Sequence, residues 1–187
     1  MFNTGQACIT SSRIYVHHSI RDEFLVAYQG TIRAMAQIIG SAGDEKTTHG
    51  PQTEGKVLFG GDAPDMPGFF INPTVFTDVP DTTRVSREEI FSPVSIANTF
   101  DTEEEAIKRA KDSELGLYAA VFSKNIDRAL RVASPLESGS VGVKCTSPTM
   151  ALDLPFGGYK QSGVGRKFGV NALSYWKEAK RVFVKLE

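Results

Sequence analysis

The sequence predicts an α/β domain with a largely parallel sheet that is flanked by helices. Short runs rich in β-branched and aromatic residues, such as 13–17 and 94–100, are typical of strands. Each of these two runs is followed by a capping residue and a segment with helical periodicity. Strands that alternate with helices indicate a layered domain. With 187 residues, of which 41% are hydrophobic, the chain is long enough to bury a core.

The N-terminal part begins with the strand at 13–17, after which Ser19 is expected to cap a helix. The apolar stripe of this helix consists of Phe24, Leu25, Tyr28, Ile32, Met35 and Ile39. Residues 40–68 are rich in Gly, Pro, Asp and Thr and predict a loop, with one short strand at 56–59. Residues 69–76 are expected to be extended.

The C-terminal part continues the alternation. Asp101 or Thr102 is expected to cap a helix after strand 94–100. The apolar run 118–122 predicts a strand buried on both faces. A helix at 125–133 and a strand at 140–145 follow. We expect 94–100, 118–123 and 140–145 to share one sheet, and 181–186 to form an edge strand. No linker interrupts the chain, so a single domain spanning 1–187 is expected.

Composition and charge argue against several functional classes. The net charge of −1 gives no broad attraction to nucleic acid or to an acidic membrane surface. No charged-then-apolar leader and no apolar run of about 18 residues is present, which favours a cytoplasmic protein. Two cysteines do not make a disulfide framework. The three histidines lack the spacing of metal ligands, so no metal site is expected.

Cys8 is the main candidate for chemistry. It follows a Gly5-Gln6 turn at an expected helix start, where the partial positive charge of the helix favours a thiolate nucleophile. Such a thiolate can add to a carbonyl carbon, and the backbone N–H of Cys8 can stabilise the resulting oxyanion. The alternative is a relic cysteine without catalytic function. Cys145 ends an apolar strand and is expected to be a buried, unreactive side chain.

Four segments of the chain, in order, resemble motifs of the aldehyde dehydrogenase superfamily. The stretch 2–8, FNTGQAC, resembles the segment around the catalytic cysteine. The other three are 88–94 (EEIFSPV), 116–123 (GLYAAVFS) and 155–163 (PFGGYKQSG). Their order matches the catalytic domain and C-terminal segment of that family. The resemblance therefore implies an aldehyde-dehydrogenase-like catalytic domain, with residues 175–187 as an oligomerisation strand.

The resemblance also implies roles for individual residues. Cys8 corresponds to the catalytic nucleophile, and Glu89 and Phe91 correspond to residues that hold the nicotinamide ribose. Phe156 matches a residue that lines the substrate tunnel, although packing in the core is an alternative. Pro148 and Met150 lie on the matching substrate loop.

Several family features have no counterpart in these 187 residues. The resemblance places the dinucleotide-binding domain, the glutamate general base and one oxyanion-binding asparagine ahead of the cysteine motif. The sequence contains no glycine-rich strand–turn–helix unit of the dinucleotide type. Binding of NAD or NADP by this chain is therefore not expected, and Glu89 and Phe91 are interpreted as vestigial cofactor positions. Ser92 and Lys144 replace the glycine and asparagine that the family usually has.

Three hypotheses for the function follow. The first is an enzyme on a truncated aldehyde dehydrogenase scaffold, which uses Cys8 for cofactor-independent addition, cyclisation, isomerisation or condensation of a carbonyl compound. Such chemistry would suit small-molecule biosynthesis. The second is NAD(P)-dependent aldehyde oxidation, as in the family. The third is a non-catalytic pseudoenzyme or partner subunit. In each case we expect a homo-oligomer, most simply a dimer, because 181–186 is an exposed strand that needs a pairing partner.

Overall fold

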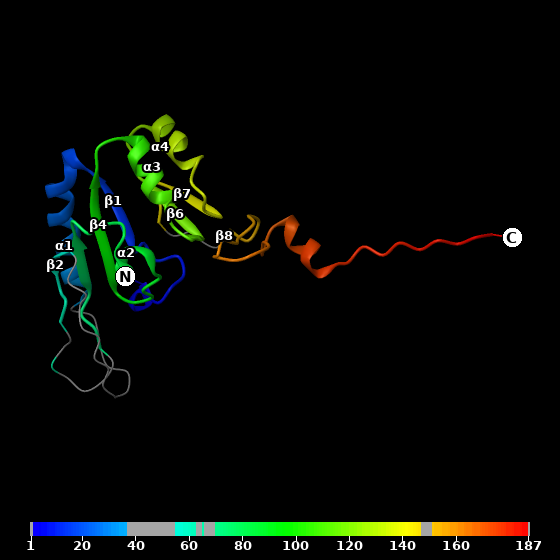
Figure 1. The fold of residues 1–187 in the computed structure, drawn as a ribbon, viewed down its shortest axis with the longest axis horizontal. Helices are drawn as coiled ribbons and strands as arrows, with labels where there is room; N and C mark the ends of the chain where they lie inside the picture. The colour runs from blue at the N-terminus through cyan, green and yellow to red at the C-terminus, as the bar shows by residue number, and fades with distance from the viewer. Residues whose placement is uncertain (1, 37–54, 63–64, 66–69, 147–150, 187) are drawn as a thin grey trace. The chain divides into compact units, whose positions relative to one another are not determined.

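The computed structural model describes residues 2–36, 55–62, 65, 70–146 and 151–186. Within it the chain forms two compact units, Met1–Ser113 and Glu114–Glu187 (Figure 1). The predicted substrate-loop residues Pro148 and Met150 lie outside the described residues, as do His49 and the end of the first helical stripe at Ile39.

The first unit is built on a four-stranded, largely parallel sheet with the strand order β1-β4-β3-β2. β1 (Arg13–His17) and β3 (Thr74–Thr77) both pair in parallel with β4 (Val94–Phe100). β2 (Lys56–Phe59) closes one edge and runs antiparallel to β3. All four strands lie in segments that the sequence predicts to be extended. The predicted α/β class with a largely parallel sheet is therefore confirmed.

Helices cover both faces of this sheet (Figure 1). α1 (Arg21–Ala36) buries Leu25 and Ile32 against Val75 and Ala97. The hydroxyl of Tyr28 on the same helix lies 3.0 Å from that of Ser95, and burial raises the pKa of Tyr28. On the other face lies α3 (Glu103–Lys111), which contacts β1 through Arg109 and Tyr15.

The helix starts follow from local capping chemistry, with one difference from expectation. Thr102 accepts a hydrogen bond from the backbone N–H of Glu105, and the Glu105 carboxylate accepts one from the N–H of Asp101. This reciprocal pair identifies Thr102, one of the two predicted candidates, as the cap. Ser19, in contrast, does not cap α1. A short 3₁₀ turn, η2 (His18–Ile20), precedes α1, and the His17 ring accepts from the N–H of Ser19.

The expectation that 94–100, 118–123 and 140–145 share one sheet is wrong. β4 pairs with β1 along one edge and with β3 along the other, so both of its hydrogen-bonding edges are occupied. The other two segments form β6 (Tyr118–Val121) and β7 (Ser140–Val143), which pair with each other in a separate two-stranded sheet. β6 is half-buried along its length and not buried on both faces as predicted.

The second unit contains a parallel βαβ element. α4 (Ile126–Ala133) connects β6 and β7, and its fully buried Ala129 marks the packed face. Asn125 caps this helix by accepting from the N–H of Arg128 at 2.9 Å. A second, antiparallel pair is formed by β5 (Leu115–Gly116) and β8 (Tyr159–Lys160). The predicted helix at 125–133 is thus confirmed within one residue at its start.

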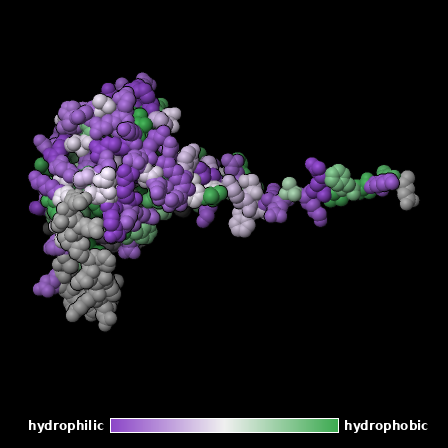
Figure 2. Space-filling model, in the orientation of Figure 1, coloured by the Kyte–Doolittle hydropathy of each residue, from purple (hydrophilic) through white to green (hydrophobic). Residues whose placement is uncertain are grey.

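The C-terminal segment differs from expectation. After the 3₁₀ helix η3 (Val170–Trp176), residues 177–186 form no strand in the described structure, so the predicted edge strand at 181–186 is absent there. Its apolar side chains are nevertheless exposed, and Figure 2 shows hydrophobic residues among hydrophilic ones in this segment. They are Val182, Phe183, Val184 and Leu186. Within the described part of the chain, no helix has both the length and the apolar character needed to span a membrane.

An ion pair between the short helix α2 (Arg84–Arg87) and the end of α3 predicts a pH effect on stability. Arg87 donates to both carboxylate oxygens of Asp112 at 2.9 Å, and these hydrogen bonds hold the pKa of Asp112 below its usual value. A carboxyl group with a lowered folded-state pKa contributes its full stability above the unfolded pKa of about 3.9. This contribution decreases below that pH and is lost as the pH falls through the lower pKa of the folded state.

We therefore expect Arg87→Leu to lower the urea midpoint slightly at pH 7 and by less at pH 3, where only the hydrogen bond to the Asp112 backbone carbonyl is independent of pH. The difference should be small because the pair is exposed and screened by salt. Arg33→Leu is the control for loss of a surface arginine, because Arg33 is exposed and lies over the Phe59 ring, not against a carboxylate. A deficit for Arg87→Leu that is equal at pH 7 and pH 3 would contradict this account.

Candidate active site

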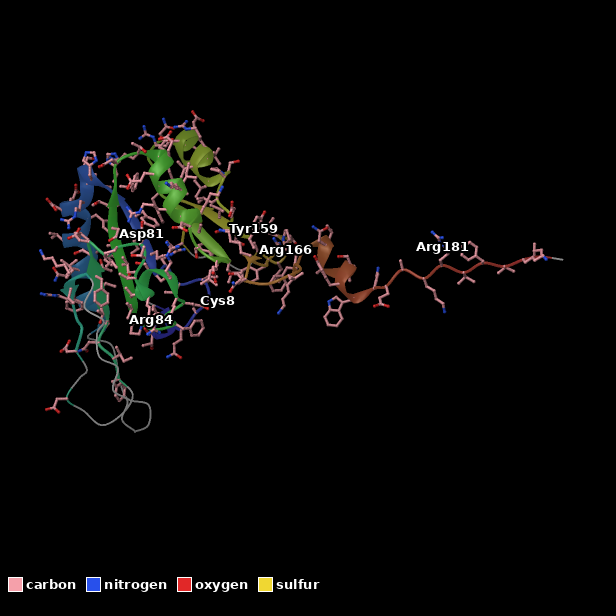
Figure 3. All side chains as sticks on the ribbon, in the orientation of Figure 1. Cys8, Asp81, Arg84, Tyr159, Arg166 and Arg181 are labelled. Carbon is pink, nitrogen blue, oxygen red and sulfur yellow. The ribbon has the colours of Figure 1, made fainter. Side chains whose placement is uncertain are left out.

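The loop that carries Cys8 is fixed at both of its ends to one short segment, 92–96. At one end, Gly5 packs on the peptide between Ser92 and Pro93. At the other end, the carbonyl of Ser12 accepts a 2.7 Å hydrogen bond from the N–H of Ile96, in register with β1. Cys8, which is labelled in Figure 3, lies on the N-terminal loop between these two anchors. The loop is therefore held relative to the start of β4.

Gly5 is required at its position for two reasons. Its φ of +74° lies in the left-handed region, which glycine adopts without steric cost. A Cβ there would also overlap the carbonyl oxygen of Ser92 and lie 2.6 Å from its carbonyl carbon. The sequence marks the Gly5-Gln6 turn, but it cannot show that the turn rests on Ser92, because these residues are far apart in the chain.

The local structure at Cys8 differs from the predicted helix start. Cys8 lies in a turn in which the N–H of Thr10 donates to the carbonyl of Ala7 at 2.9 Å, after the 3₁₀ helix η1 (Phe2–Gly5). No helix begins at Cys8, so the helix start expected at this position is absent. The thiol is exposed, and the thiol of Cys145, which was expected to be buried, is exposed too. Cys145 follows the end of β7, where the chain leaves the sheet.

The structure distinguishes the two adjacent glutamates that precede β4. Arg84 donates two 2.8 Å hydrogen bonds to the two carboxylate oxygens of Glu88, which lowers the pKa of that carboxyl group. Glu89 is exposed and makes no hydrogen bond or ion pair with any described residue. Its two oxygens are available to accept hydrogen bonds from a ligand. The pairing of Arg84 with Glu88 follows from their i,i+4 spacing.

Phe91 combines exposure with backbone strain. Its side chain is 49% exposed, and its φ of +55° is unusual for an aromatic residue. Such a conformation costs about 1–3 kcal/mol and is found where the surroundings enforce it. The segment thus presents an exposed aromatic ring and an exposed carboxylate two residues apart.

Phe156 belongs to the second unit and is half-buried. Its backbone exchanges two 2.7 Å hydrogen bonds with Lys167 in an isolated bridge, which fixes the start of the 155–163 turn. No group of three or more His, Cys, Asp or Glu residues within the described ranges is arranged to hold a metal ion.

Known proteins with similar sequences are aldehyde dehydrogenases. An aldehyde dehydrogenase of Enchytraeus buchholzi is 43% identical over 99% of this chain and 40% of its own length. Retinaldehyde dehydrogenase 3 of Rattus norvegicus is 41% identical over the whole chain and 39% of its own length. The chain thus spans about two fifths of the length of the curated relatives it matches.

Solved structures give the same result. Betaine aldehyde dehydrogenase of Staphylococcus aureus, in complex with NAD+, superposes with a TM-score of 0.81 and 37% identity over 94% of this chain and 39% of that one. In an apo structure of a variant of that enzyme, a cysteine is modified by BME. The model of the aldehyde dehydrogenase family matches residues 1–55 and 52–182. The chain belongs to the aldehyde dehydrogenase family.

Proposed function

We propose that the chain carries the thiol nucleophile and the nicotinamide-ribose contacts of an NAD(P)-dependent aldehyde oxidation. The observation that carries the proposal is the loop of Cys8, which is anchored to the segment that directly follows Glu89 and Phe91. Family membership supports this oxidation better than it supports the cofactor-independent chemistry inferred first from the sequence.

The chemistry assigned to Cys8 begins with addition of its sulfur to the aldehyde carbon. A C–S bond forms, and the π electrons of the carbonyl move to oxygen to give a thiohemiacetal anion. The backbone N–H of Cys8 makes no hydrogen bond with any described residue and can donate to this oxyanion. After oxidation to the thioester, water adds to the carbonyl carbon, the C–S bond breaks, and a carboxylic acid leaves with the thiol restored.

The dinucleotide supplies the hydride acceptor that converts the thiohemiacetal into the thioester. Glu89 would accept hydrogen bonds from the ribose hydroxyls, and Phe91 would pack on the nicotinamide side of the sugar. Contacts from these two residues alone would give little affinity for the dinucleotide. We expect this chain by itself to bind NAD+ more weakly than about 100 μM by calorimetry.

The substrate class is an aldehyde, with Phe156, Pro148 and Met150 assigned to its contacts. According to their names, two of the relatives act on retinaldehyde and on betaine aldehyde. These two aldehydes differ widely in polarity. No narrower substrate is therefore assigned. We also propose a cytoplasmic homo-oligomer in which residues 175–187 serve as the pairing segment. Exposed Val182, Phe183 and Val184 support this assignment, because apolar side chains favour burial against a partner.

The proposal is tested by two reactions of the purified chain. p-Nitrophenyl acetate reports acylation of a nucleophilic thiol by release of p-nitrophenolate, with the acetylated residue located by mass spectrometry. Hexanal with millimolar NAD+ reports oxidation by absorbance at 340 nm. We expect acylation at Cys8 and slow NADH formation. Both should fall by about 10² or more in Cys8→Ser, because the hydroxyl is far less nucleophilic than the thiol. Cys145→Ser, which removes the other exposed cysteine, should retain both reactions.

The outcomes separate the three functional hypotheses. Acylation of Cys8 without NADH formation at any NAD+ concentration would overturn the oxidation proposal for this chain and favour cofactor-independent carbonyl chemistry. Loss of neither reaction in Cys8→Ser would remove the nucleophile assignment. Absence of both reactions in the folded wild-type chain would favour a non-catalytic partner subunit.

A further inference from the structure

We propose that Gly5 and Phe91 are positioning residues that couple the location of the Cys8 thiol to the conformation of the segment Glu89–Pro93. This inference deepens the proposed function, since it rests on Cys8 as the nucleophile. In this proposal, a displacement of Glu89 or Phe91 reaches Cys8 through the backbone contact between Gly5 and Ser92. Cys8 lies three residues beyond Gly5.

The contact between the two segments leaves no free space. Gly5 is buried, and a single added carbon would overlap the Ser92 carbonyl oxygen and lie 3.0 Å from the nitrogen of Pro93. The Ser92–Pro93 peptide is held by its own hydrogen bonds. The Ser92 carbonyl accepts from Val94 at 2.7 Å, and the Pro93 carbonyl accepts from Thr74 at 2.8 Å. Because this rigid peptide is in direct contact with Gly5, a displacement of the Ser92–Pro93 peptide must also displace the turn at Gly5.

Phe91 is the residue through which a bound dinucleotide would act on this contact. Its left-handed backbone immediately precedes Ser92, so a change in its backbone conformation would displace the chain that carries the Ser92 carbonyl. A ligand that packs on the exposed Phe91 ring acts on this strained residue directly. The second anchor, between Ser12 and Ile96, keeps the far end of the loop fixed, so displacement is taken up between Gly5 and Ser12.

The test measures how fast iodoacetamide alkylates Cys8 between pH 6 and 9.5, with Cys145 in the same molecule as the internal reference. The variants are Gly5→Ala, Phe91→Gly and the double variant. Gly61→Ala is the matched control: Gly61 also has a left-handed φ, of +94°, but a Cβ there meets only ordinary contacts at 3.5 Å or more. A synthetic peptide of residues 2–12 supplies the rate of an unpositioned thiol.

We expect the rate for Cys8 to differ from that of the peptide by about threefold or more, and Gly5→Ala to move it toward the peptide value. Phe91→Gly removes the strain of the left-handed backbone at position 91. The Ser92–Pro93 peptide can then shift to accommodate the methyl group that Gly5→Ala adds. The double variant should therefore depart from the product of the two single effects by about threefold or more. Gly61→Ala should leave the Cys8 rate unchanged and combine multiplicatively with Phe91→Gly.

Identical rates for wild-type Cys8 and the peptide, or multiplicative effects of Gly5→Ala and Phe91→Gly, would overturn the coupling. If circular dichroism shows that Gly5→Ala does not fold, Phe91→Gly alone tests the proposal. Phe91→Gly should change the alkylation rate of Cys8 and not that of Cys145. An unchanged alkylation rate of Cys8 would contradict the proposal. The assay uses neither aldehyde nor dinucleotide. Its failure therefore leaves the oxidation proposal standing, and a negative oxidation assay leaves the coupling standing.

Discussion

Replacing Asn98 with alanine is expected to lower the free energy of unfolding by about 2–4 kcal/mol. Asn98 is buried in β4 beyond the last residue pair of β3, Thr77 with Ala97. Its amide donates to the Val79 carbonyl at 2.7 Å and accepts from the Val79 N–H at 3.0 Å, so the side chain replaces the strand ladder where β3 ends. Alanine leaves both groups of the buried Val79 without partners, and buried unpaired backbone groups are costly. Urea unfolding followed by circular dichroism measures the loss.

Asn98→Asp separates this hydrogen-bond account from a simple packing effect, because aspartate has nearly the same shape. As a carboxylate it can still accept from the Val79 N–H, but it faces the Val79 carbonyl with no proton to donate. Burial and this repulsion raise the pKa of the introduced group in the folded state. Protonation therefore favours the folded state, and the deficit relative to wild type should shrink as the pH falls from 7 to about 4. A deficit independent of pH would contradict the account.

Asn125→Ala is the matched control for loss of an asparagine amide. Asn125 is exposed and caps α4 with one hydrogen bond, so its loss should cost only about 1 kcal/mol.

Local sequence signals predicted the strands β1, β4 and β6 and the helices α1, α3 and α4, because capping and alternation act over a few residues, but they failed at Cys8 and at 181–186. The pair Thr102 and Glu105 and the cap at Asn125 are examples in which side-chain chemistry fixes a helix start. The division into sheets was not predictable in this way. Whether β4 pairs with β6 depends on which strands occupy its edges, and those strands, β1 and β3, come from distant parts of the chain. Hydrophobic patterns do not encode strand partners.

The candidate site was predicted by resemblance as a set of residues, without its geometry. The sequence motif gives Cys8 and Glu89, but it misplaces Cys8 at a helix start. The turn is instead closed by a hydrogen bond between Thr10 and Ala7 and by contact with Ser92. The local sequence also gives no sign of the left-handed φ of Phe91, because non-glycine residues adopt this region only where their surroundings enforce it.

The second large effect is expected for Arg109→Leu, with a loss of about 2–4 kcal/mol in the free energy of unfolding. Arg109 is only 18% exposed and connects three elements of the first unit. It donates two hydrogen bonds to the carboxylate of Asp81, at 2.8 and 2.9 Å, and one to the Thr99 carbonyl at 2.6 Å. Its guanidinium also lies over the Tyr15 ring, 4.9 Å from the centroid. Leucine keeps part of the packing and removes every one of these polar contacts.

Arg109→Lys tests whether charge alone is sufficient. Lysine keeps the positive charge, but its ammonium cannot make the paired hydrogen bonds to Asp81 while also reaching the Thr99 carbonyl. We therefore expect Arg109→Lys to lose at least half of what Arg109→Leu loses. In a double-mutant cycle with Asp81→Asn, the two changes should be non-additive, since they remove the same pair of hydrogen bonds. Full stability of Arg109→Lys would show that the planar fork is not needed, and additive losses would show that Arg109 stabilises the fold without Asp81.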